Sequence, residues 1–288
     1  MARAPQHHAH RARAFALPLV VLLSMVATMA IAVMLERQGQ QTRATVRQMR
    51  WTQDRHLERG VREIAGSWLT GASRRLNEIA KEGGHALDLN MEDGRTIRLD
   101  IEDAQGSVLS VFDGVSENEL PFAQGAYDTI QLRAGDQETL DRWTRTVGPA
   151  AISAVTAPEE VLAAAASPMI GDGQASAMAR DIVLAREGAA DSVGTQWLRQ
   201  VIAEYMTEME DRRIMQRLLV AEPDLWRLRI TVLDGRGRVG SMYEAVVHVD
   251  GREIRQRADS GAFTPLGPFL LWRRLDEAEM VAQAAGGR

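Results

Sequence analysis

The feature that most constrains this chain is an apolar segment close to its N-terminus. Phe15 to Leu35 contains no charged residue, and two basic residues, Arg11 and Arg13, stand shortly before it. About 20 helical residues, each rising about 1.5 Å, cross a hydrocarbon layer about 30 Å thick. The sequence therefore predicts a single membrane-spanning helix over residues 15–35.

A cleaved secretory signal is the alternative explanation, because it also places an apolar run after basic residues. The apolar part of such a signal has about 7 to 15 residues and ends at a cleavage site of small residues. Here the run is longer and passes into Glu36-Arg37-Gln38 without such a site. These lengths favour a helix that stays in the mature protein.

The charged residues do not decide which way the span crosses the membrane, but they do limit the class of partner. The positive-inside bias is nearly balanced, since Arg3, Arg11 and Arg13 precede the span and Arg37, Arg43, Arg47 and Arg50 follow it. The absence of cysteine is compatible with both export and cytoplasm. With 34 basic and 39 acidic residues the net charge is −5, which argues against nucleic acid as the main partner.

After the span, apolar residues recur every three or four positions, which is typical of a one-faced helix. They include Leu57, Val61, Ile64, Trp68, Ala72, Leu76 and Ile79. The membrane helix is therefore predicted to continue as one amphipathic helix over 36–84, with Gly83-Gly84 ending it.

The period then changes to alternation. Leu87, Leu89 and Met91 and then Ile97, Leu99 and Ile101 flank the turn signal Asp93-Gly94, which predicts a β-hairpin. A third strand, Val108 to Phe112, is expected to complete an antiparallel meander within 85–115.

Residues 116–222 are helical in composition. Thr156 is the expected N-cap of one helix, with Pro158 in its first turn and Glu159 or Glu160 as the reciprocal capping carboxylate. The turn Ile170-Gly171-Asp172-Gly173 leads to a second helix, and a third is expected from Thr195 to Leu219.

Alternation returns over 223–275, before a tail at 276–288. Trp226 to Val232 and Tyr243 to Val249 predict two strands around Asp234-Gly235, the second ending at Asp250-Gly251, and Phe269 to Trp272 predicts one more. The simplest arrangement returns these strands to the first sheet. The predicted fold class is α+β, a long transmembrane and amphipathic helix packed on a pilin-like antiparallel sheet with an inserted all-helical domain.

Two other functions remain as alternatives. Two helices around the turn at Gly171 resemble a helix-hairpin-helix, which would make the chain a membrane-anchored periplasmic binding protein of the competence or DNA-uptake type. Asp172 and Asp181 would repel phosphate there, which favours a small helical packing unit. A membrane-anchored enzyme is the other alternative, but the sequence has no H-E-x-x-H, G-x-S-x-G or phosphate loop, so we expect no catalysis.

Three motifs, together with the order of parts, carry a resemblance to a known family. Arg13-Ala14-Phe15-Ala16-Leu17 looks like a prepilin peptidase junction, Thr156 to Leu162 looks like a T-A-x-x-E-V-L helix start, and Leu270 to Arg274 looks like a last strand. Over nearly its whole length the chain resembles the K-type minor pseudopilins of type II secretion systems, the general secretion pathway protein K family.

The resemblance implies a leader over 1–14, cleavage between Ala14 and Phe15, and N-methylation of Phe15 at the mature N-terminus. Leu19 then occupies the fifth mature position, where ordinary pilins carry Glu. In those relatives the carboxylate is thought to pair inside the membrane with a neighbour's terminal amine, because an unpaired charge there is costly. A subunit that starts a filament has no earlier neighbour, so Leu19 is what a tip subunit would show.

The family also implies partners, a location and the residues of the insert. Thr156, Ala157, Glu160 and Leu162 would mark the helix start of the inserted domain. The partners would be other minor pseudopilins, the major pseudopilin, prepilin peptidase and inner-membrane lipid. The chain would cross the inner membrane once, with a cytoplasmic N-terminus and a periplasmic C-terminal domain, and the family acts without catalysis in protein secretion.

The chain departs from the family at two places. Ala14 stands where Gly is most common, and Ile152-Ser153-Ala154-Val155 replaces an Asn-rich segment. Some members bind calcium in the helical domain, but the chain has no acidic loop with the spacing of a calcium loop, so no cofactor or metal ligand is assigned.

Overall fold

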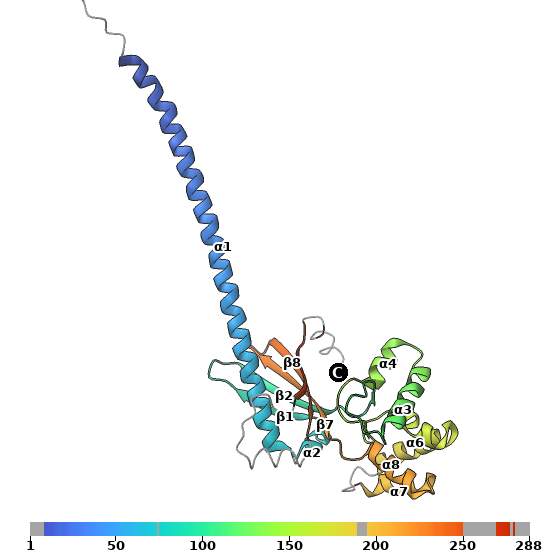
Figure 1. Cartoon of the computed structure of the whole chain (residues 1–288). Helices are drawn as coiled ribbons and strands as arrows, with labels where there is room; N and C mark the ends of the chain where they lie inside the picture. Colours follow the sequence, from blue (N-terminus) through green and yellow to red (C-terminus); the bar gives the residue numbers. More distant parts are fainter. Residues whose placement is uncertain (1–8, 74, 189–194, 250–268, 277–278, 280–288) are drawn as a thin grey trace, which may run out of the picture. The chain divides into compact units, whose positions relative to one another are not determined.

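The structure is a computed structural model of the chain, and it describes residues 9–73, 75–188, 195–249, 269–276 and 279. Side chains are described from residue 18 onward. The chain divides into two compact units, Met1–Gly60 and Val61–Arg288. The predicted α+β class is confirmed, with a long apolar N-terminal helix, a five-stranded antiparallel sheet and a helical insert (Figure 1).

Helix α1 (Ala9–Ala72) contains the predicted membrane segment and most of the amphipathic continuation. Its side chains are exposed from residue 18 to His56, whereas Val61, Ala65 and Leu69 are buried at steps of four, as expected of a helix with one apolar face.

The prediction of one unbroken helix as far as Glu82 was wrong. Helix α1 ends at Ala72 and a second helix, α2 (Leu76–Lys81), follows after a turn in which the Arg75 amide donates to the Ala72 carbonyl. Gly71 and Ser73 are weak helix formers, which gives the break its physical reason. The predicted stop is confirmed, because Gly83 and Gly84 have φ values of 107° and 77°, which favour glycine.

The sheet has the strand order β1-β2-β7-β8-β9, and every neighbouring pair is antiparallel. Its strands are β1 (His85–Asn90), β2 (Thr96–Asp103), β7 (Leu225–Leu233), β8 (Val239–His248) and β9 (Phe269–Arg274). The hairpin predicted around Asp93-Gly94 is confirmed by the pairing of Leu89 with Ile97. The C-terminal strands rejoin the first sheet as predicted, while Asp250-Gly251 lies outside the described residues.

The predicted third strand of a meander was wrong. Only Val108–Leu109 is extended (β3), and it pairs in parallel with β4 (Thr144–Arg145) in a separate sheet. The second neighbour of β2 is β7, which pairs from Thr96 with Leu233 to Asp103 with Trp226. The longer alternation of β7 buries more apolar surface beside β2 than a two-residue strand can.

The two faces of the sheet differ in chemistry. One face holds buried apolar residues, among them Leu99, Leu228 and Ile230, and the Arg62 guanidinium of α1 lies 5.4 Å from the Phe269 ring and 5.5 Å from the Trp272 ring of β9. The opposite face carries ion pairs between neighbouring strands, namely Arg98–Asp88, Arg227–Glu102 and Arg273–Glu244.

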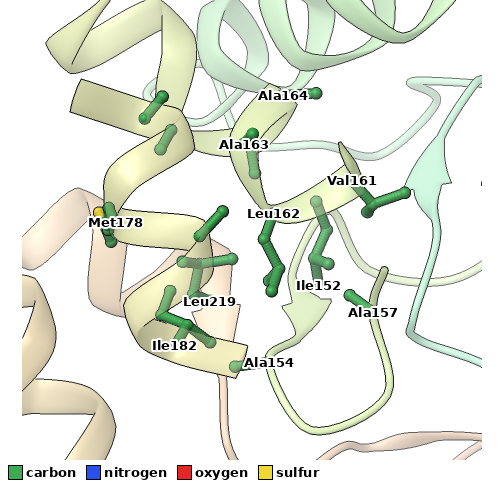
Figure 2. Close-up of a cluster of buried hydrophobic side chains, with 14 of the residues drawn as sticks. Ile152, Ala154, Ala157, Val161, Leu162, Ala163, Ala164, Met178, Ile182 and Leu219 are labelled. Carbon is green, nitrogen blue, oxygen red and sulfur yellow. The ribbon is translucent and has the colours of Figure 1, made fainter. Parts of the chain in front are cut away.

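The helical insert has its own apolar core (Figure 2). Its helices are α3 (Leu120–Arg133), α4 (Gln137–Trp143), α5 (Glu159–Ile170), α6 (Asp172–Gly188), α7 (Gln196–Tyr205) and α8 (Met209–Leu218), and the two-residue strands β5 (Ile152–Ser153) and β6 (Leu219–Val220) pair in parallel. Alanines 163–166 of α5 are buried beside Met178 and Ile182 of α6. Small side chains let the helices approach closely, and a Cβ on Gly125 of α3 would lie only 2.8 Å from Pro168 Cγ of α5.

The single helix predicted from Thr195 to Leu219 is two helices. The chain is extended at Met206, with φ −121° and ψ 116°, so α7 ends there and α8 starts at Met209. The Arg212 side chain donates to the carbonyls of Met206 and Ala203. These bonds satisfy acceptors that the end of α7 leaves without helical partners.

Candidate functional site: an exposed apolar helix and the junction of the helical insert

The apolar part of α1 is an exposed surface. The large apolar side chains from Leu19, which is 58 % exposed, to Leu35 are exposed, and the helix is long and apolar enough to cross a membrane. Soluble monomers rarely expose a continuous apolar surface of this extent. The chain thus has one long apolar N-terminal helix, consistent with a single membrane span or a signal anchor.

Polar side chains within this segment are satisfied by the helix itself. Ser24 Oγ donates to the Val21 carbonyl at 2.8 Å, and Thr28 Oγ1 donates to the Ser24 carbonyl at 2.7 Å. Bonds of this kind leave no hydroxyl hydrogen unpaired in a hydrocarbon environment. The segment can therefore enter lipid along its whole circumference.

The residues of the predicted cleavage junction are only partly described. The backbone of Ala14 and Phe15 belongs to α1, and their side chains lie outside the described residues. Leu19 is described, and its apolar side chain is exposed on α1.

The sheet and the insert meet at the side chain of Gln105, which follows β2 and is 1 % exposed. Its amide nitrogen Nε2 donates to the Ala151 carbonyl at 2.9 Å, and its Oε1 accepts from the Asp224 and Leu225 amides at 2.9 and 3.2 Å. Its backbone carbonyl accepts from the Ser153 amide. One residue thus joins the end of β2, the strand that precedes α5 and the start of β7.

Thr156 takes part in this junction and is not the N-cap that the sequence predicted. Helix α5 begins at Glu159 with Pro158 as its N-cap residue, and no side chain caps it. The Thr156 hydroxyl instead donates to Asp103 Oδ2 at 2.6 Å, while Asp103 Oδ1 accepts from the Gln105 amide at 2.7 Å. Local spacing could not reveal this, because the competing acceptor comes from a strand 53 residues earlier.

The other residues predicted to mark the helix start have separate roles. Ala157 and Leu162 are buried in the core of the insert, whereas Glu160 is exposed in the first turn of α5, where a carboxylate suits the helix dipole. The Ala157 carbonyl accepts from Arg186 Nη1 of α6 at 2.7 Å.

Arg145 is a second centre of the junction that sequence reasoning missed. Its guanidinium donates to the carbonyls of Ser107, Val147, Pro149 and Ala151. Burial lowers the pKa of Arg145 to about 10, although the Asp103 carboxylate acts in the opposite direction, so the group stays charged at neutral pH. No pattern around Thr144-Arg145-Thr146 distinguishes this arginine from exposed ones.

The turn between α5 and α6 carries the carboxylate of Asp172. Asp172 Oδ1 accepts from Ser167 Oγ at 2.6 Å and from Arg133 Nη2 at 2.7 Å, and these bonds hold the pKa of Asp172 below its usual range. The negative charge sits at the N-terminus of α6, where a helix-hairpin-helix would hold a phosphate. This placement counts against phosphate binding at the turn.

An open hollow of about 440 Å³ lies between α7 and α8. Its lining combines three exposed arginines and one carboxylate with apolar side chains, namely Thr195, Leu198, Arg199, Ile202, Arg213, Gln216, Arg217, Leu219, Val220, Ala221 and Glu222. In the described part of the chain, no group of three His, Cys, Asp or Glu side chains is placed to hold a metal ion.

Replacing Gln105 by methionine is expected to lower the free energy of unfolding by about 3 kcal/mol, because the Asp224 and Leu225 amides lose their acceptor and the Ala151 carbonyl keeps only its bond from Arg145. Chemical denaturation would measure the change, and hydrogen exchange should quicken at the two amides. Gln131→Met is the matched control, since this exposed amide bonds only Tyr127, and it should change stability little. Equal effects of the two substitutions would contradict the assigned role of Gln105.

Comparison with known proteins found no protein-family model and no curated protein that matches this chain.

Proposed function

We propose that this protein is a minor pseudopilin of a type II secretion system, the subunit that initiates or caps the periplasmic pseudopilus. The observation that carries the proposal is one continuous helix with two kinds of surface. Its first part is apolar and exposed, and its last part is buried through Val61, Ala65 and Leu69 in a domain built on an antiparallel sheet. A pilin-type subunit needs both surfaces, one to stay in the membrane and one to carry its head, which here is the domain formed by the five-stranded sheet and the helical insert.

The position of Leu19 supports a place at the start of the filament. A glutamate there would need a positive partner within the membrane, since an unpaired charge at that depth is costly. Leu19 is uncharged, so it needs no positively charged partner inside the membrane. A first subunit can thus wait in the bilayer before any neighbour is present.

The size of the insert supports the capping role. Helices α3 to α8 stand between β2 and β7, two strands that are neighbours in the sheet. In the proposed role these helices make the head too bulky for another subunit to be added above it. The buried side chains of Gln105 and Arg145 tie the insert to the sheet at the places where the chain enters and leaves it.

Contact with other subunits is assigned to the exposed apolar positions of α1 beyond the span. Val46 and Met49 are 41 % and 62 % exposed, whereas Ile64 and Trp68 of the same helix are half-buried within the head. The chain alone leaves Val46 and Met49 uncovered, and apolar side chains of neighbouring α1 helices would cover them.

Co-purification tests the proposal. When the full-length chain is expressed with two other minor pseudopilins of one system, a ternary complex should be recovered in detergent, and Val46→Asp with Met49→Asp should abolish it. Arg142→Asp, at an exposed position of α4, is the control that should leave the complex intact. A chain that stays alone in the presence of both partners would refute the assignment.

A further inference from the structure

The part of α1 that follows the span is strongly basic. Residues 37–53 contain four arginines, Arg37, Arg43, Arg47 and Arg50, and no acidic residue, although the whole chain has a net charge of −5. All of these positions are helical and exposed. The segment therefore has a local charge opposite in sign to that of the chain as a whole.

Three of the arginines form one stripe. Arg43, Arg47 and Arg50 are separated by steps of four and three, which places them on one face of the helix. The next carboxylates along the helix are Asp54, Glu58 and Glu63, and each of them already has an interaction of its own. In the part of the chain that the structure describes, no carboxylate pairs with the three guanidinium groups of this stripe.

The stripe lies within reach of a membrane surface. Arg43 is eight positions beyond Leu35, the last apolar residue of the span, which corresponds to about 12 Å along the helix axis. The Cα–Cβ bonds of a helix point toward its N-terminus, which here is the side of the membrane, and a long arginine side chain reaches farther in that direction. Attraction to anionic headgroups extends over about one Debye length, about 8 Å at physiological salt.

We propose that Arg43, Arg47 and Arg50 bind the anionic phospholipid headgroups of the leaflet at which α1 leaves the membrane. The proposal rests on the membrane span of the proposed function and on no other part of it. Binding tilts the helix toward its arginine face, so Arg43, the residue nearest the bilayer, contributes most and Arg50 least.

Because the chain has no cysteine, a single introduced cysteine can be spin-labelled without side reactions. Val46 lies beside the stripe, and Thr45 lies on the opposite side of the helix. Full-length protein carrying Val46→Cys or Thr45→Cys would be reconstituted into vesicles of phosphatidylcholine alone or of equimolar phosphatidylcholine and phosphatidylglycerol. The measured quantity is the accessibility of the nitroxide to a neutral water-soluble relaxing agent.

The label at position 46 should become about twofold less accessible when phosphatidylglycerol is present, and high salt should reverse the change. The label at position 45 should change little. The triple variant R43Q/R47Q/R50Q should remove the response, and among single variants Arg43→Gln should weaken it most. The triple variant R142Q/R199Q/R236Q, which removes equal charge from exposed positions of the head, should retain it.

If the nitroxide at position 46 is equally accessible in vesicles with and without phosphatidylglycerol, the proposal is overturned. The proposal would also be overturned if the R43Q/R47Q/R50Q variant kept the response to phosphatidylglycerol. Flotation with vesicles of both compositions shows separately that the span is inserted, and recovery of the ternary complex tests the secretion role. Failure of the lipid proposal is therefore distinguishable from failure of the proposed function.

Discussion

Replacing Ala14 by tryptophan is expected to abolish conversion of the full-length chain to a shorter form in cells that contain prepilin peptidase. Arg13-Ala14-Phe15 resembles the cleavage site in the substrates of that enzyme, which has a small residue just before the cut. An indole ring at this position would not fit the subsite that accepts the small residue. Gel migration and the intact mass of the purified protein would report the loss of cleavage.

Ala12→Trp is the matched control, because it adds the same ring to the leader two positions before the junction. It should still be processed, and its mature form should begin at Phe15 and carry one extra methyl group. Cleavage also removes Arg3, Arg11 and Arg13 without an acidic residue, so the charge of −5 becomes −8 and the mature form should focus at a lower pH. The predicted cleavage site would be disproved if Ala14→Trp were still converted to the shorter form, or if the parent chain were never converted.

Replacing Arg145 by methionine is expected to lower the free energy of unfolding by about 4 kcal/mol, the largest loss of stability anticipated for a single substitution in the head. The methionine fills much of the same space but leaves the carbonyls of Ser107, Val147 and Pro149 without this donor, while the Ala151 carbonyl keeps only its bond from Gln105. Denaturant titration of the full-length protein in detergent would measure the difference.

Arg142→Met provides the comparison for this loss. Arg142 is exposed on α4 and pairs with Glu138 at 3.2 Å, a surface pair worth at most about 0.5 kcal/mol. The pH dependence of the parent gives a second check. Burial lowers the pKa of Arg145 to about 10, so folding disfavours the charged form, and the contribution of this group to stability should rise as the pH increases above about 10. Equal losses for the two substitutions would show that Arg145 does not hold the junction.

The parts of the fold that the sequence predicted correctly depend on short-range patterns. Steps of three and four predicted the amphipathic end of α1, and Asp93-Gly94 between two alternating runs predicted the hairpin of β1 and β2. Gly83 and Gly84 marked the helix stop because their positive φ values exclude most other residues. The alternation over Trp226 to Val232 predicted a strand that rejoins the first sheet, and β7 does so.

The errors share a different cause. Thr156 has the residue type and spacing of an N-cap, but Asp103 offers its hydroxyl a stronger, charged acceptor. Val108 to Phe112 has apolar residues suited to a strand, but the place beside β2 is taken by β7. In each case a residue far away in the sequence outcompeted the local preference.

By itself, the sequence determined that the chain has, near its N-terminus, a helix long and apolar enough to cross a bilayer, and that a helical insert interrupts an antiparallel sheet. Periodicity along the chain is sufficient for both conclusions, because each element is recognised from its own residues. Only the tertiary structure decided that Gln105 and Arg145 join the insert to the sheet. Their partners are backbone carbonyls and amides, which every residue possesses, so only folding reveals which of them are brought together.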